Sequence, residues 1–302
     1  MRSMADGSLR VVLIALAGNL GIAATKAAAF VLTGSSAMLT EAIHSAVDSG
    51  DQILMLVGQA RASKPPDAAH PFGHGMETYF WSFIVALMVF TAGGVAAIWQ
   101  GIHKLGHPEP IDRPWINFIV LAVSAVFEGI SFRSGYREYR RIVRGRDVGL
   151  IQFLRISKDP SLFAVLVEDG AALIGLALAA LGVAGALLGA SWADGAASVL
   201  IGCLLVFVAM FLANETRSLI AGEAAAPPIV QSVCDVIGRD RRVTAIAELQ
   251  SLHLGPRVIL FAITLRFRSD LSSDALQAAA KELTEAVRGA DPRIGPVFLR
   301  PD

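Results

Sequence analysis

Charged residues are scarce in this chain: they make up 17% of its 302 residues, whereas hydrophobic residues make up 54%. Soluble globular domains carry about 25% charged residues, so a soluble single domain is a poor interpretation. The formal net charge is zero, and this average combines long uncharged stretches with short charged loops. Such a balance gives no support to nucleic acid as a partner.

The chain also has few cysteines and lacks a nucleotide-binding loop. The only cysteines are Cys203, in an apolar run, and Cys234, in a polar segment, so neither a structural disulfide nor an oxidising compartment is expected. The sequence has no G-x-x-x-x-G-K-[ST] loop, which favours an ion gradient over ATP as the energy source. Arg2 and Arg10 precede an apolar stretch that is too long for a secretory signal, so we expect a retained helix.

Long apolar runs, in contrast, are abundant. A membrane-spanning helix needs about 20 mostly apolar residues, and all four tryptophans fall near the ends of such runs, as expected at the headgroup level. Arginine and lysine gather in the loops after the second and fourth runs, which predicts cytoplasmic termini. A bacterial inner membrane is the default expectation for the location. The six predicted spans are approximately 9–32, 36–60, 79–103, 115–133, 161–188 and 193–213.

The composition changes after Asn214, where apolar runs shorten and Pro227 and Pro228 mark a helix start. We therefore expect an α-helical membrane protein with a six-helix transmembrane domain over 1–221 and a small cytoplasmic α+β domain over 222–302. The second helix of that domain should carry an apolar stripe of Leu276, Ala280, Leu283 and Val287. The predicted order is helix 227–239, strands 243–253 and 257–268, helix 272–288 and strand 293–299.

The second predicted span holds four ionisable residues on one side, with Gln52 beside them. They follow one another at spacings of three, four and three: Glu41, His44, Asp48 and Asp51. An ionisable side chain in hydrocarbon costs at least about 2.5–3.5 kcal/mol on insertion scales, so it persists mainly where it lines a cavity, pairs or binds an ion. Imidazole and carboxylate one turn apart suit tetrahedral Zn²⁺, whereas a polar face satisfied by neighbouring helices is the alternative.

The fifth predicted span contributes Glu168 and Asp169, whose side chains diverge by about 100° on a helix. One of them is expected to bind metal and the other to support it or carry a proton, at a site shared with the second span. Lys26 and Glu128 are further polar residues in apolar stretches, for which helix-packing hydrogen bonds or snorkelling are the better interpretation.

The loop after the second span contains three potential ligands within eight residues: Asp67, His70 and His74. Glycine and proline between them allow the loop to fold back, so it can form a second metal site. Histidines exposed by chance are an equally acceptable interpretation.

Three motifs together resemble the cation diffusion facilitator family: His44-Ser-Ala-Val-Asp48, the run from Ser35 to Leu39, and His70-Pro-Phe-Gly-His74-Gly. The resemblance covers essentially the whole chain. It implies six spans, a ferredoxin-like or metallochaperone-like cytoplasmic domain, a homodimer, and export of Zn²⁺ in exchange for protons. It also implies that His44 and Asp48 are metal ligands and that Asp67, His70 and His74 match a loop site.

The fifth span departs from the family pattern, because the family's ligand positions fall on Ser161 and Val165. Glu168 and Asp169 lie one turn further along, which resembles the mitochondrial zinc-transporter branch. If residue 165 lies level with His44, Glu168 lies nearly level with Glu41, and the site is displaced toward that residue. In the C-terminal domain, His253 is expected to be a surface or sheet residue, and no metal cluster is expected there.

The cargo and the function class stay open at this point. Oxygen ligands from Glu41, Asp48, Asp51, Glu168 and Asp169 would also suit Mn²⁺ or Fe²⁺, and Co²⁺ is a further candidate. A membrane enzyme in which metal activates water is disfavoured, so no enzymatic activity is expected. A non-transporting metal-sensing membrane protein is the remaining alternative.

Overall fold

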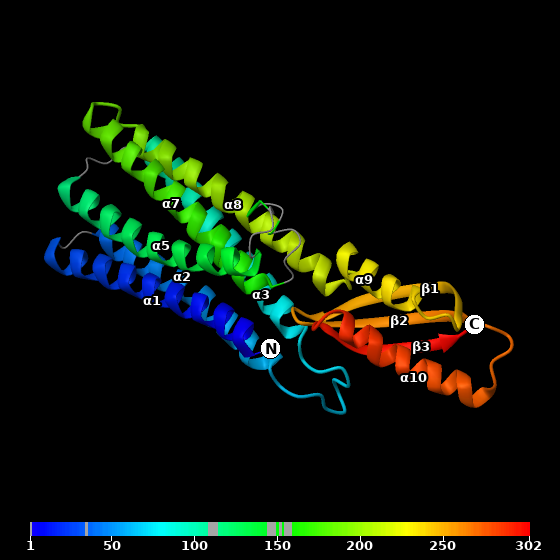
Figure 1. Ribbon diagram of the computed structural model, residues 1–302. Coiled ribbons are helices and arrows are strands. Elements are labelled where there is room, and N and C mark those ends of the chain that lie inside the picture. Colours follow the sequence, from blue (N-terminus) through cyan, green and yellow to red (C-terminus); the bar gives the residue numbers. More distant parts are fainter. Residues whose placement is uncertain (1, 34–35, 108–113, 144–148, 151–152, 154–158) are drawn as a thin grey trace. The chain divides into compact units, whose positions relative to one another are not determined.

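The computed structural model describes residues 2–33, 36–107, 114–143, 149–150, 153 and 159–302, and no side chains for 2–8, 32–33, 36–44 and 47. The chain forms two compact units (Figure 1). The helical unit consists of Arg2–Ala60 and Phe80–Thr216, and the C-terminal unit consists of Arg61–Tyr79 and Arg217–Asp302. The predicted domain boundary after residue 221 stays a prediction; the C-terminal unit also contains the loop that follows the second span.

The long helices match the six predicted spans. Among the described residues, five helical segments are long and apolar enough to cross a membrane, and the remaining predicted span, the second, is the more polar helix α2. The protein is therefore built as an integral membrane protein. The helices are α1 (Arg2–Thr33), α2 (Ser36–Ala62), α3 (Glu77–Met88), the π-helix η1 (Val89–Val95), α4 (Ala96–Gly106), α5 (Pro114–Val143), α7 (Pro160–Leu187) and α8 (Ala193–Ile220), with α3, η1 and α4 forming one continuous span.

Helix α5 continues ten residues beyond its predicted end at residue 133. Its last turns contain Arg140 and Arg141, but Tyr139 and Val143 are buried and Tyr139 packs edge-on against Phe153. The predicted end of this helix was too early, because hydropathy detects only the part of a helix that lies in hydrocarbon. An amphipathic helix end can continue outside the membrane.

Glycines allow α8 to approach the third span closely. A Cβ at Gly101 would lie 2.6 Å from the backbone nitrogen of Val199, and one at Gly202 would lie 2.7 Å from that of Ile98. Gly94 and Gly195 make similar approaches one heptad away on the two helices. Small residues commonly form such interfaces in membranes, where van der Waals packing between helices is a main driving force.

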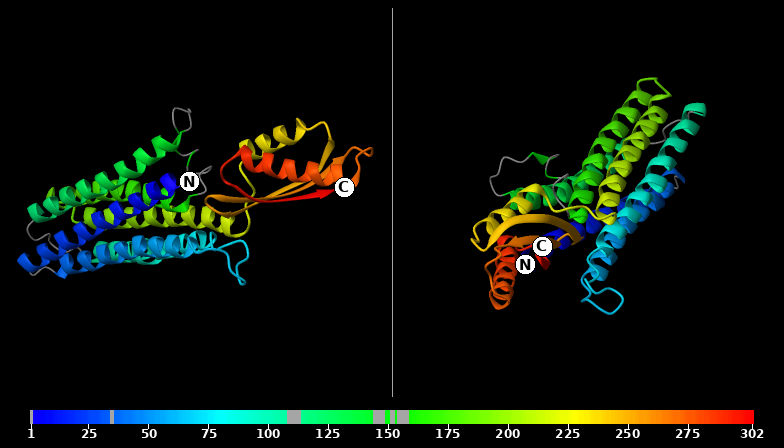
Figure 2. Two further views of the ribbon diagram at one scale, coloured as in Figure 1. Left: turned by 60° about the horizontal axis from the view of Figure 1, so that its bottom comes forward. Right: turned by 90° about the vertical axis from the view of Figure 1, so that its right-hand side faces the viewer.

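Helices α1, α5 and α7 pack against one another around a common apolar core (Figure 2, left). The core includes Val12 from α1, Tyr139 from α5, and Phe163 and Val165 from α7, all nearly inaccessible. This core fixes α7 in position, and α7 carries Glu168 and Asp169.

The C-terminal unit has the predicted α-β-β-α-β order. Strand β2 lies in the middle of the sheet, antiparallel to β1 and parallel to β3. A parallel neighbour requires a crossover, which α10 supplies. The elements are α9 (Pro227–Gly238), β1 (Val243–Gly255), β2 (Val258–Phe267), α10 (Ser273–Ala290) and β3 (Ile294–Pro301).

One face of this sheet is buried by α9 and α10. Alternate residues of β2, from Ile259 to Leu265, face the helices and are nearly inaccessible. The predicted stripe of α10 is confirmed at Leu283 and Val287, with Ala279 as the third buried position. His253 is a sheet residue, as expected, and it is only 1% exposed.

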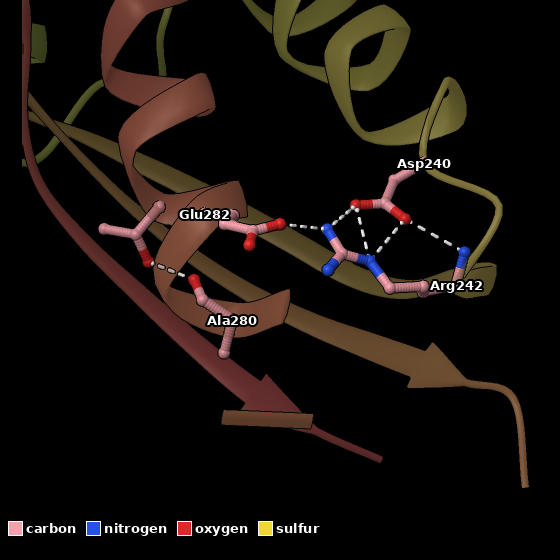
Figure 3. A network of polar contacts seen from close by, with 5 residues as sticks. Asp240, Arg242, Ala280 and Glu282 are labelled. Carbon is pink, nitrogen blue, oxygen red and sulfur yellow. Dashed lines mark hydrogen bonds and ion pairs between the residues drawn. The ribbon is translucent and has the colours of Figure 1, made fainter. Parts of the chain in front are cut away.

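A network of ion pairs joins the turn after α9 to α10 (Figure 3). The guanidinium of Arg242 donates to Asp240 and to Glu282, with N–O distances of 2.7 Å in both pairs. The hydrogen bonds from Arg242 lower the pKa of the Asp240 carboxyl. The network ties the turn before β1 to the helix that crosses over the sheet.

Candidate functional site

A hydrogen bond between buried polar side chains connects α2 to α7. Gln52 Nε2 donates to Glu168 Oε2 over 3.3 Å, and Gln52 is 2% exposed. Glu168 lies about 12 Å along α7 from Pro160 at 1.5 Å per residue, well inside a membrane-spanning helix. The second and fifth spans thus meet through polar side chains, as a shared site requires.

Carboxylates surround this bond. Asp51 and Asp48, both from α2, interact electrostatically with Glu168. Asp51 is 6% exposed. Three buried oxygens around the Gln52–Glu168 bond accept no hydrogen bond from the described residues: Asp51 Oδ1, Gln52 Oε1 and Glu168 Oε1. Burying acceptors without donors is costly, and carboxylate and amide oxygens are ligands for hard and borderline divalent cations.

Glu168 and Asp169 face different neighbours, which confirms that the adjacent side chains diverge. Glu168 faces Gln52 and Asp51 on α2, whereas Asp169 lies beside Ser131 and interacts electrostatically with Glu128, both on α5. Asp169 is 4% exposed. The arrangement gives the two carboxylates separate surroundings although they are neighbours in sequence.

Lys26 and Glu128 join α1 and α5 to the same region. Lys26 Nζ donates to Ser45 Oγ of α2 over 2.8 Å, which confirms the interhelical hydrogen bond expected for this residue. Glu128 interacts electrostatically with Asp48 and Lys26. Ser45, like Ser131, was not identified from the sequence, because serines are common in membrane helices and a single one gives no signal.

The expected position of Glu168 along α2 is wrong. It was expected level with Glu41, but it bonds to Gln52, which lies eleven residues later and about 16 Å further along the helix. The error came from aligning Val165 with His44, although helix register depends on packing along the whole interface. Glu41 and His44 belong to α2, but their side chains lie outside the described residues.

The loop after α2 brings Asp67, His70 and His74 together. One ligand atom from each lies within 4.8 Å of the others, and Asp67 Oδ2 lies 2.9 Å from His74 Nε2. Backbone N–H groups of Ala69 and His70 donate to Asp67 Oδ1. The His70 backbone bond and the His74 side chain lower the pKa of Asp67 to about 2. A carboxylate and two imidazoles are a three-ligand set that suits Zn²⁺ and leaves a fourth position open.

The same loop packs onto the sheet of the C-terminal unit. A Cβ at Gly75 would overlap the carbonyl oxygen of Leu254, near the end of β1. Phe72 meets Phe298 of β3 edge-to-face, with ring centroids 6.4 Å apart. These contacts hold the three ligands in a defined loop geometry.

The chain is similar in sequence to known proteins over most of its length. The transmembrane domain of the cation efflux family matches residues 12–221. The mitochondrial proton-coupled zinc antiporter SLC30A9 of Xenopus laevis is 30% identical over 293 residues, which cover 94% of this chain and 52% of that protein. Metal tolerance protein C4 of Arabidopsis thaliana is 28% identical over 291 residues, or 94% and 64% of the two chains. The chain thus spans about half to two thirds of the length of these two relatives.

A bacterial protein extends the comparison. The manganese efflux system protein MneP of Bacillus subtilis is 25% identical over 281 residues, which cover 93% of this chain and 91% of MneP. The family match covers most of the chain, and the first relative is a mitochondrial protein. The chain belongs to the cation efflux family of membrane transporters, the cation diffusion facilitators, in its mitochondrial-type branch.

Proposed function

We propose that the protein is a secondary transporter that exports a divalent transition-metal ion, with Zn²⁺ as the main cargo, in exchange for protons. The observation that carries this proposal is the bond between Gln52 and Glu168, surrounded by buried acceptor oxygens of two membrane helices. A relative that is 30% identical is described as a proton-coupled zinc antiporter. Ion binding gives these costly buried acceptors a function.

The transported ion binds between α2 and α7. Asp48, Asp51 and Glu168 supply carboxylate oxygens, while Gln52 holds Glu168 in position. His44, about 12 Å before Gln52 along α2, supplies an imidazole nitrogen to the ion at a neighbouring point of the pathway. Asp169, which faces α5, is a second carboxylate for a proton. Glu41 lies too far along α2 to share an ion with Glu168, so it acts elsewhere on the pathway.

Proton exchange follows from the chemistry of these ligands. Carboxylates and imidazole bind metal in their deprotonated forms, so metal binding releases protons. In alternating access, the metal enters from the cytoplasm and displaces protons, and protons reload the ligands after the site opens to the other side. The concentration gradient of one ion then drives transport of the other ion across the membrane.

The remaining parts support this cycle. Asp67, His70 and His74 bind a second Zn²⁺ in the loop of the C-terminal unit. The domain over residues 222–302 joins two copies in a homodimer. Arginine-rich loops orient both termini toward the cytoplasm, in a bacterial inner membrane.

Manganese is the second candidate cargo, because the ligand atoms gathered around Glu168 in the described part of α2 and α7 are all oxygens. Oxygen ligands suit Mn²⁺, whereas imidazole suits Zn²⁺. The relative MneP is described as a manganese efflux protein. His44 therefore decides between the two cargoes.

The test is metal-driven proton flux in proteoliposomes that contain only this protein, with Zn²⁺, Mn²⁺, Fe²⁺ and Co²⁺ compared. We expect Zn²⁺ to give the largest flux, His44→Ala to reduce Zn²⁺ flux more than Mn²⁺ flux, and Glu168→Gln to abolish both. Metal binding without any flux in the wild type would favour a sensing protein and would overturn the transport proposal.

A further inference from the structure

Two of the six histidines lie at the far end of the third span. His103 lies in the last turn of α4 and His107 is its C-cap residue, one turn later, and both are exposed. The backbone N–H of His107 donates to the carbonyl of His103 over 2.9 Å, so helical geometry reaches His107. Residues four apart on a helix share one face, and the two imidazole centroids are 5.2 Å apart.

This spacing suits bidentate metal binding. Histidines at i and i+4 are the helical ligand pair of H-E-x-x-H zinc sites. With Zn–N bonds of about 2.0–2.1 Å, two imidazole rings bound to one ion have centroids about 5 Å apart, close to the separation observed. We propose that His103 and His107 together bind a divalent transition-metal ion, with water as the other ligands, at the end of the third span.

The surroundings favour a cation at this position. The C-terminus of a helix carries a partial negative charge, and both histidines lie at that end of α4. The nearest lysine in sequence, Lys104, pairs with Asp194 of α8 over 2.9 Å, which compensates its charge. The span from Glu77 to Gly106 contains 30 residues; at about 45 Å it exceeds the hydrocarbon thickness of about 30 Å, so its ends reach water.

Histidine pairs therefore flank the third span in sequence, with His70 and His74 before it and His103 and His107 at its end. The new site uses no residue of the α2–α7 site. It holds an ion on the side of the membrane opposite to the histidine loop. This proposal rests on the proposed function only for the class of ion, because metal binding at His103 and His107 does not require transport.

Trp99 supplies a local readout. Its ring stacks on that of His103 with centroids 6.0 Å apart, so an open-shell ion such as Cu²⁺ bound to the pair should quench its fluorescence. The experiment uses the full-length chain in detergent with Trp99 as its only tryptophan, titrated with Cu²⁺. The three other tryptophans are replaced by phenylalanine: Trp81, Trp115 and Trp192.

We expect saturable quenching, with at least tenfold weaker affinity in both His103→Ala and His107→Ala, because each variant loses one arm of the chelate. The matched control is the double variant His70→Ala and His74→Ala, which should quench as the parent does. Both histidines are exposed, so alanine should not disturb folding, and an unchanged metal-free emission spectrum checks this. Quenching that survives loss of both histidines, or affinity within twofold of the parent in either single variant, would overturn the proposal. Absence of transport in the parent would contradict the proposed function and leave this result valid.

Discussion

Replacing Gln52 by leucine should weaken metal binding strongly and change the stability of the fold little. Gln52 holds Glu168 by one hydrogen bond, and its own Oε1 is buried without a partner among the described residues. Losing a partner that orients a metal ligand typically costs 10–100-fold in affinity, or about 1.4–2.7 kcal/mol. Leucine has a similar volume and removes the unpartnered acceptor Oε1, but it also removes the donor to Glu168 Oε2, so one buried acceptor without a donor replaces another, at about 1–3 kcal/mol each. We therefore expect a large effect on transport and a small effect on stability.

The assay is metal-driven proton flux as a function of Zn²⁺ concentration, together with thermal unfolding of the same protein in detergent. The KM for metal should rise 10–100-fold in Gln52→Leu, and the melting temperature should change little. Gln52→Asn retains an amide on a side chain one methylene shorter, so it should give a smaller increase in KM.

Ser49→Ala is the matched control. Ser49 is also buried in α2, but its hydroxyl donates to the carbonyl of Ser45 in the same helix over 3.0 Å, so it holds no residue of α7. Its KM should remain that of the wild type. An unchanged KM in Gln52→Leu, alongside a Glu168→Gln variant that loses transport, would refute a positioning role for Gln52 and reduce the bond to helix packing.

Three other predictions follow from the packing and the charges. Gly101→Leu should destabilise the contact between α4 and α8 by about 1–3 kcal/mol or more through overpacking, measured by thermal unfolding, whereas Gly129→Leu, with open space around it, should not. Asp240→Asn should cost about 0.5–1 kcal/mol at pH 7, measured by hydrogen exchange in α9 and α10. Because the folded pKa of Asp240 is lowered, that difference is complete above about pH 4 and should vanish as the pH falls through the lowered value; a constant difference would contradict it. His74→Ala should reduce the number of bound Zn²⁺ ions by one per chain in equilibrium dialysis, and an unchanged number would exclude the loop site.

The sequence predicted the elements of the fold well, because long apolar runs and alternating strands are local signals. All five elements of the C-terminal unit lie within two residues of their predicted bounds. Extensions beyond the membrane were missed, as at the end of α5, where apolar and basic residues alternate in a pattern that hydropathy does not detect. The grouping of the Arg61–Tyr79 loop with the C-terminal unit was also not predicted. It depends on contacts of Gly75 and Phe72 with distant residues, and a single sequence carries no signal for such contacts.

The candidate site was predicted in its residue types and less well in its arrangement. Ionisable residues in apolar runs identified α2 and α7, since their burial is costly wherever they lie. The pairing of Glu168 with Gln52 was missed, because a sequence fixes the spacing within each helix and not how far one helix is shifted along another. The packing of many side chains sets that shift. Aligning the two helices on one residue, Val165, therefore does not predict it.

The divergence of Glu168 and Asp169 also bears on how metal and protons are coupled. The two carboxylates belong to consecutive residues of one helix, yet Glu168 contacts α2 and Asp169 faces α5. A helix moves as a rigid element, so any rotation or shift of α7 that changes the contacts of Glu168 with α2 also changes those of Asp169 with α5. Release of an ion at one carboxylate is then mechanically linked to a changed environment at the other. Asp169→Asn should therefore alter the number of protons exchanged per metal more than the KM for metal, measured as the ratio of proton to metal flux; a raised KM with an unchanged ratio would instead make Asp169 a metal ligand.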